Sequence, residues 1–416
     1  MRTWTEGSSL VVALDGRLDA VNSGEAGAFI RQAMAEHPGL TPVVDAGELQ
    51  FISSAGLRML LGLSRDCGGL TLREVTPEVY DILQMTGFTS ILTVVRKMRE
   101  ISVAGCPVIG RGAIGTVYRL DGETIVKVYE IPDCLPMIEN EQRRAKQALI
   151  KGIPTAISYD IVKVGEKYGS VFELINARSF NSLLAESPER ADELIRRYTG
   201  IIRQVHAIQA EPGELPDARD TYLGYMAQLG DVLPPRVAAW LTGLFRAMPQ
   251  DLHVIHGDFH MNNIMLSDGE ALLIDMDTLS VGNPVFDFAG IFVAYRAFNL
   301  DDPGNSMAFL GIPEAVSRTV CEETLANYLS REGSPVPEEA LAAARNKVET
   351  VGLVRFLYLL LVLKLGGEPA LRERRIRRAV ERLTALCDQG LVQDLTLWFS
   401  RPEKAENCAA GLPAPH

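Results

Sequence analysis

The spacing of apolar residues changes along this chain of 416 residues, and these changes are the strongest constraint on its fold. In the first 100 residues, short β-branched runs alternate with segments whose apolar residues recur at helical spacing. Strands that alternate with helices of this length predict a small α/β domain over residues 1–100. The expected strands are 9–16, 41–47, 69–75 and 91–95, and the expected helices are 24–37, 55–67 and 77–88.

After a boundary near residues 98–108 the pattern becomes β-rich and then helical. Segments typical of hairpins lead into a strong helical pattern at 137–150 and a further strand at 170–175. From about residue 180 onward helical periodicity dominates. We therefore expect a β-rich lobe followed by a helical lobe within residues 105–395, and a flexible tail at 396–416.

Charge and composition exclude several classes of protein. The formal net charge of −12 argues against a nucleic-acid partner. The six cysteines are scattered singly, so neither a zinc site nor a disulfide framework is expected. The most hydrophobic stretch, 356–363, is far shorter than the ~20 residues of a membrane span and reads as a buried helix. These features predict a cytoplasmic protein with no membrane partner.

A glycine-rich segment, "GRGAIGTVY", opens the β-rich lobe. Gly110, Gly112 and Gly115 match G-x-G-x-x-G, a pattern that two unrelated folds use. Here β-branched and aromatic residues follow the glycines, which indicates a strand–turn–strand rather than a dinucleotide-binding helix. Lys127 follows on the next strand, and a glycine hairpin before a strand lysine is the arrangement of kinases. The alternative is an ordinary hairpin with a solvated lysine.

A lysine that binds phosphates needs a carboxylate to hold it in place. The helix at 137–150 offers Glu139 and Glu141, and we favour Glu141, which stands 11 residues before Gly152 (152 − 141) of "GIPTA". The alternative is a surface glutamate on an amphipathic helix.

The stretch "HGDFHMNN" at 256–263 is the densest group of reactive side chains. Its two histidines could suggest zinc, but Gly257 stands where a metalloprotease needs glutamate and argues against a helix. The stretch instead reads as a loop before a hairpin, with Asp258 and Asn263 five residues apart. That spacing is typical of a kinase catalytic loop, in which the aspartate accepts a hydroxyl proton and the asparagine binds Mg²⁺.

A further carboxylate follows this loop in "LLIDMD". Asp275 lies at the end of a strand, 17 residues after Asp258 (275 − 258), and Asp277 is a candidate second carboxylate. A cation chelated by nucleotide phosphates takes one or two such ligands. Each residue alone could be a turn-forming residue, but the joint order of glycines, lysine, glutamate, HGDxxxxN and IDxD favours a kinase.

With these motifs, residues 105–395 resemble the aminoglycoside phosphotransferase/choline kinase group of kinase-like enzymes. The resemblance implies a bilobal α+β protein-kinase-like domain, with a β-rich N-lobe and a mostly helical C-lobe, that uses ATP or GTP and Mg²⁺. The motif IDMD in place of DFG, and the lack of an APE-type segment, favour a small-molecule hydroxyl acceptor over a protein. The resemblance assigns Asp258 as the catalytic base and Asn263 and Asp275 as the metal ligands. It assigns Lys127 as the phosphate contact and Glu141 as the partner of Lys127. Gly110, Gly112 and Gly115 would form the loop that covers the phosphates, and the backbone around Glu173 and Ile175 would contact the adenine.

In the first domain, Ser53 and Ser54 stand at the start of an apolar helix, after the strand that ends at Asp45. The simplest interpretation is that a serine caps the helix. The alternative is phosphorylation, since a phosphate there would meet free backbone amides. Residues 1–100 resemble a STAS domain, the anti-sigma-factor antagonist family. The resemblance aligns Ser54 with the phosphorylated residue of its D-S-[ST]-G-L pattern, while Ser53 replaces the aspartate.

Three functions are compatible with this organisation. The first is an ATP-dependent phosphotransferase acting on a small-molecule hydroxyl, with the STAS domain as a regulatory or docking module. The second is a partner-switching protein kinase that phosphorylates Ser54 or a separate STAS or anti-sigma protein, and an anti-sigma or other STAS-binding protein is a candidate partner. The third is a nucleotide-binding pseudokinase scaffold, against which the full set of Lys127, Asp258, Asn263 and Asp275 argues.

Overall fold

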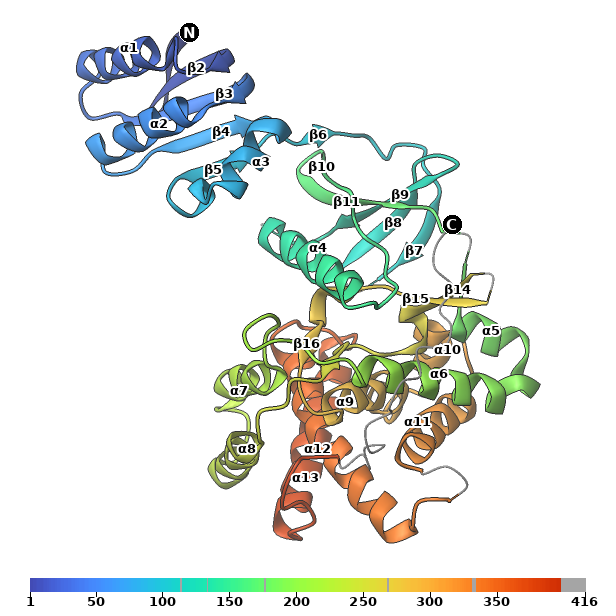
Figure 1. Ribbon diagram of the computed structural model, residues 1–416. Coiled ribbons are helices and arrows are strands. Elements are labelled where there is room, and N and C mark those ends of the chain that lie inside the picture. Colours follow the sequence, from blue (N-terminus) through green and yellow to red (C-terminus); the bar gives the residue numbers. More distant parts are fainter. Residues whose placement is uncertain (113, 133, 176, 268, 331–333, 398–416) are drawn as a thin grey trace. The chain divides into compact units, whose positions relative to one another are not determined.

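Figure 1 shows the computed structural model of the chain, which describes residues 1–416 except 113, 133, 176, 268, 331–333 and 398–416. The expected tail at 396–416 therefore lies outside the described residues from 398 onward. The chain divides into two compact units, each described by itself. The first comprises Met1–Ala104 with Ile161–Gly169, and the second comprises Gly105–Asp160 and the chain from Ser170 onward.

The first unit contains the expected α/β domain. Its sheet has the strand order β1-β2-β3-β4-β5, in which β1 is antiparallel to β2 and the remaining neighbours are parallel. Helix α1 packs on β2, α2 on β3, and α3 on β3 and β5 (Figure 1). The elements are β1 (Arg2–Glu6), β2 (Ser9–Leu18), α1 (Ser23–Glu36), β3 (Thr41–Ile52), α2 (Ser54–Asp66), β4 (Thr71–Val75), α3 (Pro77–Met85), β5 (Thr93–Arg96) and β6 (Arg99–Glu100).

Strand β1 is absent from the sequence prediction. All five of its residues are exposed, so the sequence "RTWTE" lacks the apolar alternation that marks a half-buried strand. Its backbone nevertheless pairs with β2 from Arg2 opposite Ala13 to Glu6 opposite Ser9. Pairing by backbone alone leaves no signature in the side chains, which is why the pattern misses it.

Helix α2 is amphipathic and begins at a capped end. Leu57, Leu60 and Leu63 recur at helical spacing and are buried in the core of the first unit. Ser53 is the N-cap, and its Oγ accepts hydrogen bonds from the amides of Ala55 (3.2 Å) and Gly56 (3.4 Å).

The second unit begins with the β-rich lobe. Among its strands, β7 pairs antiparallel with β8, and β8 pairs antiparallel with β9. The helix α4 packs against the short 3₁₀ segment η4 (Met276–Thr278) of the helical lobe. The elements are β7 (Val108–Arg111), β8 (Gly115–Arg119), β9 (Thr124–Tyr129), α4 (Leu135–Ile150) and the end of β11 (Lys167–Glu173), whereas β10 (Asp160–Val164) from Ile161 onward and the start of β11 are counted with the first unit.

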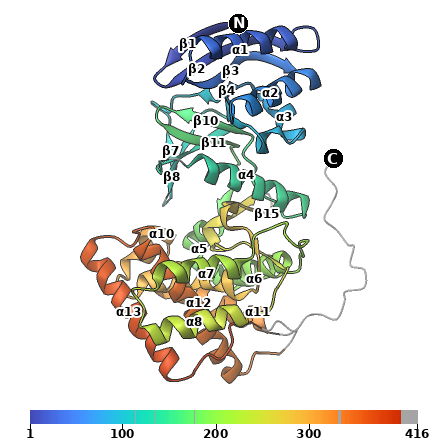
Figure 2. The ribbon, with the colours of Figure 1, turned by 90° about the vertical axis from the view of Figure 1, so that its left-hand side faces the viewer.

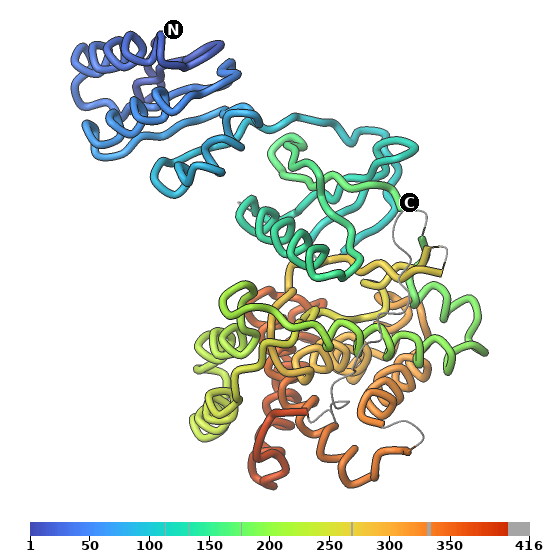
Figure 3. Tube along the Cα trace, viewed as in Figure 1, coloured from blue at the N-terminus to red at the C-terminus, as the bar shows by residue number. Residues whose placement is uncertain are grey.

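The helical lobe follows from β12 onward, as the residue patterns predict. Figure 2 shows α7 and α8 lying together, and Figure 3 traces the backbone through α9 and α12, which pack side by side. Its helices are α5 (Phe180–Glu186), α6 (Ala191–His206), α7 (Ala218–Leu229), α8 (Pro235–Ala247), α9 (Val285–Tyr295), α10 (Gly304–Leu310), α11 (Glu314–Leu329), α12 (Glu338–Leu361) and α13 (Pro369–Asp388). Its short strands are β12 (Arg178–Ser179), β13 (Val254–Ile255), β14 (Ile264–Ser267), β15 (Glu270–Leu273) and β16 (Ser280–Val281).

The apolar stretch at 356–363 belongs mostly to α12. Phe356, Leu357 and Leu360 are buried in the core of the helical lobe, whereas Val362 and Leu363 follow the helix and are partly exposed. Within the part of the chain that the structure describes, no helix is both long and apolar enough to cross a membrane.

Replacing Gly56 with alanine should destabilise the first unit. An added Cβ would lie 2.7 Å from the carbonyl oxygen of Leu18 and 2.9 Å from a side-chain carbon of Ile52, so α2 would have to move off the sheet. We expect a loss of about 1–3 kcal/mol in the free energy of unfolding, measured by urea denaturation.

Gly62 in the same helix is the matched control. An added Cβ there would meet only the Arg31 side chain at 3.7 Å. Gly62→Ala should stabilise the helix by up to about 1 kcal/mol. Equal effects of the two substitutions would contradict the close packing at Gly56.

Candidate active site

The stretch 256–263 forms a loop between β13 and β14. Strand β13 pairs with β16, which brings the start of this loop beside η4. Gly257 has φ of +83°, and an added Cβ would lie 2.6 Å from the carbonyl oxygen of Thr278. A side chain is therefore excluded at Gly257 by both backbone conformation and space.

Three hydrogen bonds join this loop to the segment that follows β15. The Ile274 amide donates to the Asn263 carbonyl oxygen (3.0 Å), and His256 Nε2 contacts the Ile274 carbonyl oxygen (3.0 Å). The Thr278 hydroxyl donates to the His256 carbonyl oxygen (2.8 Å). These bonds bring together the two segments that carry Asp258 and Asp275, which are separated in sequence.

A buried carboxylate on α9 fixes the start of the loop. Asp287 is fully buried, and its oxygens accept hydrogen bonds from the amides of His256 (3.0 Å) and Gly257. His206 Nε2 lies 2.8 Å from the same carboxylate, and its Nδ1 lies 2.8 Å from the Tyr328 hydroxyl. Without Asp287 two buried amides would lose their partner, at a cost of about 1–3 kcal/mol for each.

His256 is a neutral side chain with both ring nitrogens occupied. Since a carbonyl oxygen only accepts, the contact with Ile274 assigns the proton to Nε2, and Nδ1 then accepts from the Asp258 amide (3.3 Å). Burial lowers the pKa of this imidazole from its ordinary value. The geometry gives His256 the role of orienting the loop.

Asp258 lies between two basic side chains. Its Oδ1 accepts a 2.9 Å hydrogen bond from Arg355 on α12, and its Oδ2 is 3.5 Å from His260 Nε2. Burial alone would raise the pKa of this carboxyl, but the charges of His260 and Arg355 outweigh it and hold the pKa well below its usual range. A third of the side chain is still exposed, so a ligand can reach it.

Asn263 and Asp275 offer oxygens suited to a hard cation. Asn263 Nδ2 donates to the Asp258 carbonyl oxygen (2.9 Å), which turns the amide oxygen of Asn263 away from that contact. Asp275 adopts a left-handed conformation (φ +58°), and one of its oxygens contacts Lys127. Amide and carboxylate oxygens of this kind fit Mg²⁺ delivered with a nucleotide.

In the described ranges, no group of three or more His, Cys, Asp or Glu side chains is arranged to hold a metal by itself.

Lys127 on β9 contacts two carboxylates. Its Nζ lies 3.2 Å from Glu141 on α4 and also contacts Asp275. The Tyr129 hydroxyl donates to the other Glu141 oxygen (2.7 Å), so the buried glutamate is held on both sides. Burial would lower the pKa of Lys127, but Asp275 and Glu141 raise it above its ordinary range, so this lysine stays charged. Glu139, the other candidate partner, is exposed.

The three glycines lie in the hairpin of β7 and β8. Gly110 is in β7, Gly115 opens β8, and the Gly112 amide donates to the Gly115 carbonyl oxygen (2.9 Å). An added Cβ at Gly115 would lie 2.5 Å from the Val128 carbonyl oxygen of β9, whereas one at Gly112 would make only an ordinary contact with the Gly115 carbonyl oxygen at 3.8 Å. Gly115 is thus required by the packing of neighbouring strands, whereas Gly112 is not.

Glu173 ends β11, and Ile175 follows it in the segment that leads to the helical lobe. The Leu174 amide donates to the Glu123 carbonyl oxygen (2.6 Å), so it is already used within the β-rich lobe. The Ile175 carbonyl oxygen accepts from the Ala177 amide (2.9 Å). The Leu174 amide and the Ile175 carbonyl oxygen are therefore both engaged in hydrogen bonds within the chain.

Asp277 differs from its neighbour Asp275. Burial raises its pKa to about 7, and the negative charges of Asp275 and Glu141 add to that effect. The second aspartate of IDMD therefore lies in a buried, negatively charged environment.

In the first unit, the structure separates the roles of the two serines. Ser53 is the N-cap, whereas Ser54 is the first residue of α2 and is exposed. The first turn of α2 contains no acidic residue.

Three residues of the loop's surroundings were not identified as site residues from the sequence: Arg355, Asp287 and His206. Asp287 lies in the sequence "VFDFA", and a lone aspartate in an apolar helical stretch is a signal that could have identified it. Arg355 stands in the apolar run of α12 and offers a similar signal. Nothing in the sequence around His206 distinguishes it from other helical histidines.

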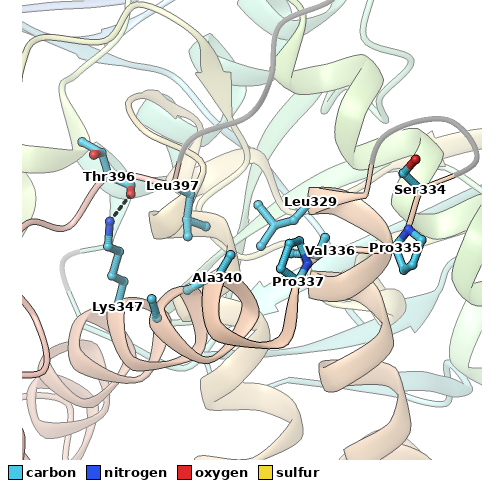
Figure 4. A pocket seen from close by; sticks show the side chains of 11 residues that line it. Leu329, Ser334, Pro335, Val336, Pro337, Ala340, Lys347, Thr396 and Leu397 are labelled. Carbon is cyan, nitrogen blue, oxygen red and sulfur yellow. Dashed lines mark hydrogen bonds between the residues drawn. The ribbon is translucent and has the colours of Figure 1, made fainter.

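A separate pocket of about 640 Å³ lies where α11 ends and α12 begins (Figure 4). Leu329, Val336 and Leu397 line it, and Lys347 donates to the Thr396 carbonyl oxygen (2.9 Å) at its edge. None of the candidate site residues contributes to this pocket.

Comparison with known families gives two matches. Residues 105–308 match the family described as "Phosphotransferase enzyme family", and residues 1–95 match "Mlab, STAS domain". A putative anti-sigma factor antagonist, BtrV of Bordetella bronchiseptica, is 32% identical over 99 residues, which are 23% of this chain and 84% of that protein.

Solved structures of aminoglycoside phosphotransferases are also similar to this chain. The crystal structure of APH(4)-Ia is 14% identical, covering 68% of this chain and 93% of that one with a TM-score of 0.45. The gentamicin complex of APH(2")-IIa is 13% identical, covering 73% of this chain and 95% of that one with a TM-score of 0.43.

Glu141→Gln should weaken nucleotide binding because it removes one of the two charges that hold Lys127. A hydrogen bond to a charged group is worth about 1.5–3 kcal/mol, so we expect the Kd for ATP to rise about tenfold or more in calorimetric titrations. Glu139→Gln, on the same helix but exposed, is the matched control and should leave the Kd unchanged. A larger effect at Glu139 would show that the wrong glutamate has been assigned.

Proposed function

Residues 105–308 match the phosphotransferase enzyme family and residues 1–95 match a STAS domain, and from these matches we propose that the chain is an ATP-dependent phosphotransferase that acts on a hydroxyl of a small molecule. One observation supports the proposal most strongly. Hydrogen bonds join the loop that carries Asp258 and Asn263 to the segment that carries Asp275, and Asp275 in turn contacts Lys127. In kinases these side chains are a base, an amide ligand, a carboxylate ligand and a phosphate contact.

The exposed part of Asp258 is the proposed site of proton transfer. The acceptor hydroxyl approaches Oδ2, since Oδ1 is occupied by Arg355. Its oxygen forms a bond to the γ-phosphorus of ATP, the hydroxyl proton passes to Asp258, and the bond to the bridging oxygen breaks so that ADP leaves with the electron pair. Asp258 thereby contributes general-base catalysis, typically worth about 10²–10⁴-fold in rate.

Lys127, Asn263 and Asp275 are the proposed nucleotide-positioning residues. Lys127 is charged and already fixed by Glu141, so little reorganisation is needed when phosphate oxygens replace its contact with Asp275. We propose that Asn263 and Asp275 hold Mg²⁺, which when bound neutralises charge on the phosphates. ATP is the proposed donor, and GTP is the alternative nucleotide. The glycine hairpin would cover the phosphates. The backbone near Glu173 and Ile175 would contact the purine base of the nucleotide.

Asp258→Asn tests the catalytic assignment. Purified protein is incubated with γ-labelled ATP, Mg²⁺ and a panel of hydroxylated small molecules, and labelled product is separated from ATP. Transfer should fall by about 10²–10⁴-fold, because the amide cannot accept the hydroxyl proton. Nucleotide binding, measured by calorimetry, should persist in the variant. Wild-type transfer rates in Asp258→Asn would overturn the assignment.

One observation favours a second function, phosphorylation of the STAS domain. Ser54 is exposed at the start of α2, while the neighbouring Ser53 serves as cap. A phosphate on Ser54 would lie at the positive end of the helix dipole and would add nearly two negative charges to an exposed surface. We therefore propose that this surface docks an anti-sigma or other STAS-binding protein and that phosphorylation of Ser54 regulates docking.

The two serines provide a matched test of this second function. If the chain is phosphorylated on Ser54, label from γ-labelled ATP should appear on the protein and disappear in Ser54→Ala. Ser53→Ala should keep the label while losing about 0.5–2 kcal/mol of stability with the cap. Label that persists in Ser54→Ala would exclude this site. Labelling of the protein without any labelled small molecule would favour a protein kinase over the small-molecule enzyme.

A further inference from the structure

Arg355 connects a distant helix to the candidate catalytic loop. It lies on α12, 97 residues after Asp258 in the sequence. Its Nη1 donates to the Gly257 carbonyl oxygen and its Nη2 donates to Asp258 Oδ1 at 2.9 Å. Only 13% of the side chain is exposed. The planar guanidinium thus holds the backbone and the side chain of the loop at once.

Two glycines make this contact sterically feasible. An added Cβ at Gly352, one turn before Arg355, would lie 2.5 Å from a ring carbon of Phe292 on α9. An added Cβ at Gly290 would lie 3.2 Å from the Gly257 carbonyl oxygen and 3.4 Å from Arg355 Nη1. The close packing of α9 against α12 therefore leaves just enough room for the guanidinium to reach the loop.

The contact limits how Asp258 can be used. An arginine is always charged and presents donors in a fixed plane, so it restricts both the rotation and the position of a carboxylate. With Oδ1 held by Arg355, the oxygen that remains for a ligand is Oδ2, which lies 3.5 Å from His260 Nε2. The hydroxyls of Tyr222 and Tyr225 also lie close enough to the guanidinium of Arg355 to interact with its charge.

We propose that Arg355 is a positioning residue for phosphoryl transfer: it fixes Asp258 through Oδ1 and Gly257 through its carbonyl oxygen, so that Oδ2 faces the acceptor hydroxyl and receives its proton. This inference rests on the proposed function. It makes α12, which contributes none of the motif residues, a part of the catalytic apparatus.

The test compares three single variants in transfer of γ-labelled phosphate from ATP, with calorimetric binding of ADP and thermal unfolding measured in parallel. Arg355→Met should lower kcat by about 10²-fold, because a small misplacement of a catalytic group costs about that factor, and leave ADP binding unchanged. Arg355→Lys keeps the charge but loses the fork and should recover part of the rate. Arg375→Met removes another buried arginine, which donates to the carbonyl oxygens of Gly366 and Phe298, and should lower stability without lowering kcat.

A double-variant cycle separates positioning from general stability. If Arg355 acts through Asp258, adding Arg355→Met to Asp258→Asn should cause no further loss of rate. The double variant also lacks the buried unpaired carboxylate, so it remains informative if Arg355→Met alone unfolds.

The outcomes distinguish this inference from the proposed function. Multiplicative losses in the double variant, or wild-type kcat in Arg355→Met, overturn the role of Arg355 while leaving the phosphotransferase assignment intact. A wild-type protein that binds ATP yet phosphorylates no acceptor overturns the proposed function and this inference with it.

Discussion

The buried carboxylate of Asp287 is the constraint on which the candidate active site depends. Asp287 accepts hydrogen bonds from the amides of His256 and Gly257 and contacts His206. The loop after β13, helix α6 and helix α9 therefore meet at this one carboxylate. A buried carboxylate without such partners would be too costly to retain. Its hydrogen bonds force the backbone to turn at Gly257, and the next residue, Asp258, then projects toward solvent and the guanidinium of Arg355. The position of the proposed base is therefore a consequence of a group that itself never meets the substrate.

Ion pairs between opposite charges join the main charged side chains of the site. Asp258 forms an ion pair with Arg355, and both Glu141 and Asp275 form ion pairs with Lys127. These ion pairs order the side chains of the site, so its electrostatic environment is largely preorganised for a nucleotide. Binding then requires exchange of partners rather than assembly of the site, and Lys127 is the residue that would exchange Asp275 for phosphate oxygens.

Much of the fold could be predicted from the sequence because local periodicity and short motifs carry the information. The alternation in residues 1–100 identified the α/β class, and the motifs around residues 256–277 pointed to two segments that the structure joins by hydrogen bonds. Strand β1 was missed because none of its side chains is buried, so its pairing leaves no pattern. Arg355 was missed because its contact with Asp258 spans 97 residues, and only the packing of α9 against α12 brings them together. Contacts between distant elements depend on tertiary packing that a single sequence does not display.

The central claim is that Asp258 promotes direct transfer of a phosphoryl group from ATP to an acceptor hydroxyl, without a phosphorylated intermediate on the protein. The stereochemistry of transfer tests this most directly, using ATP whose γ-phosphoryl group is made chiral by oxygen isotopes. A single in-line displacement predicts inversion of configuration at phosphorus in the product. Retention would reveal two successive transfers through a phosphorylated residue and would contradict the account.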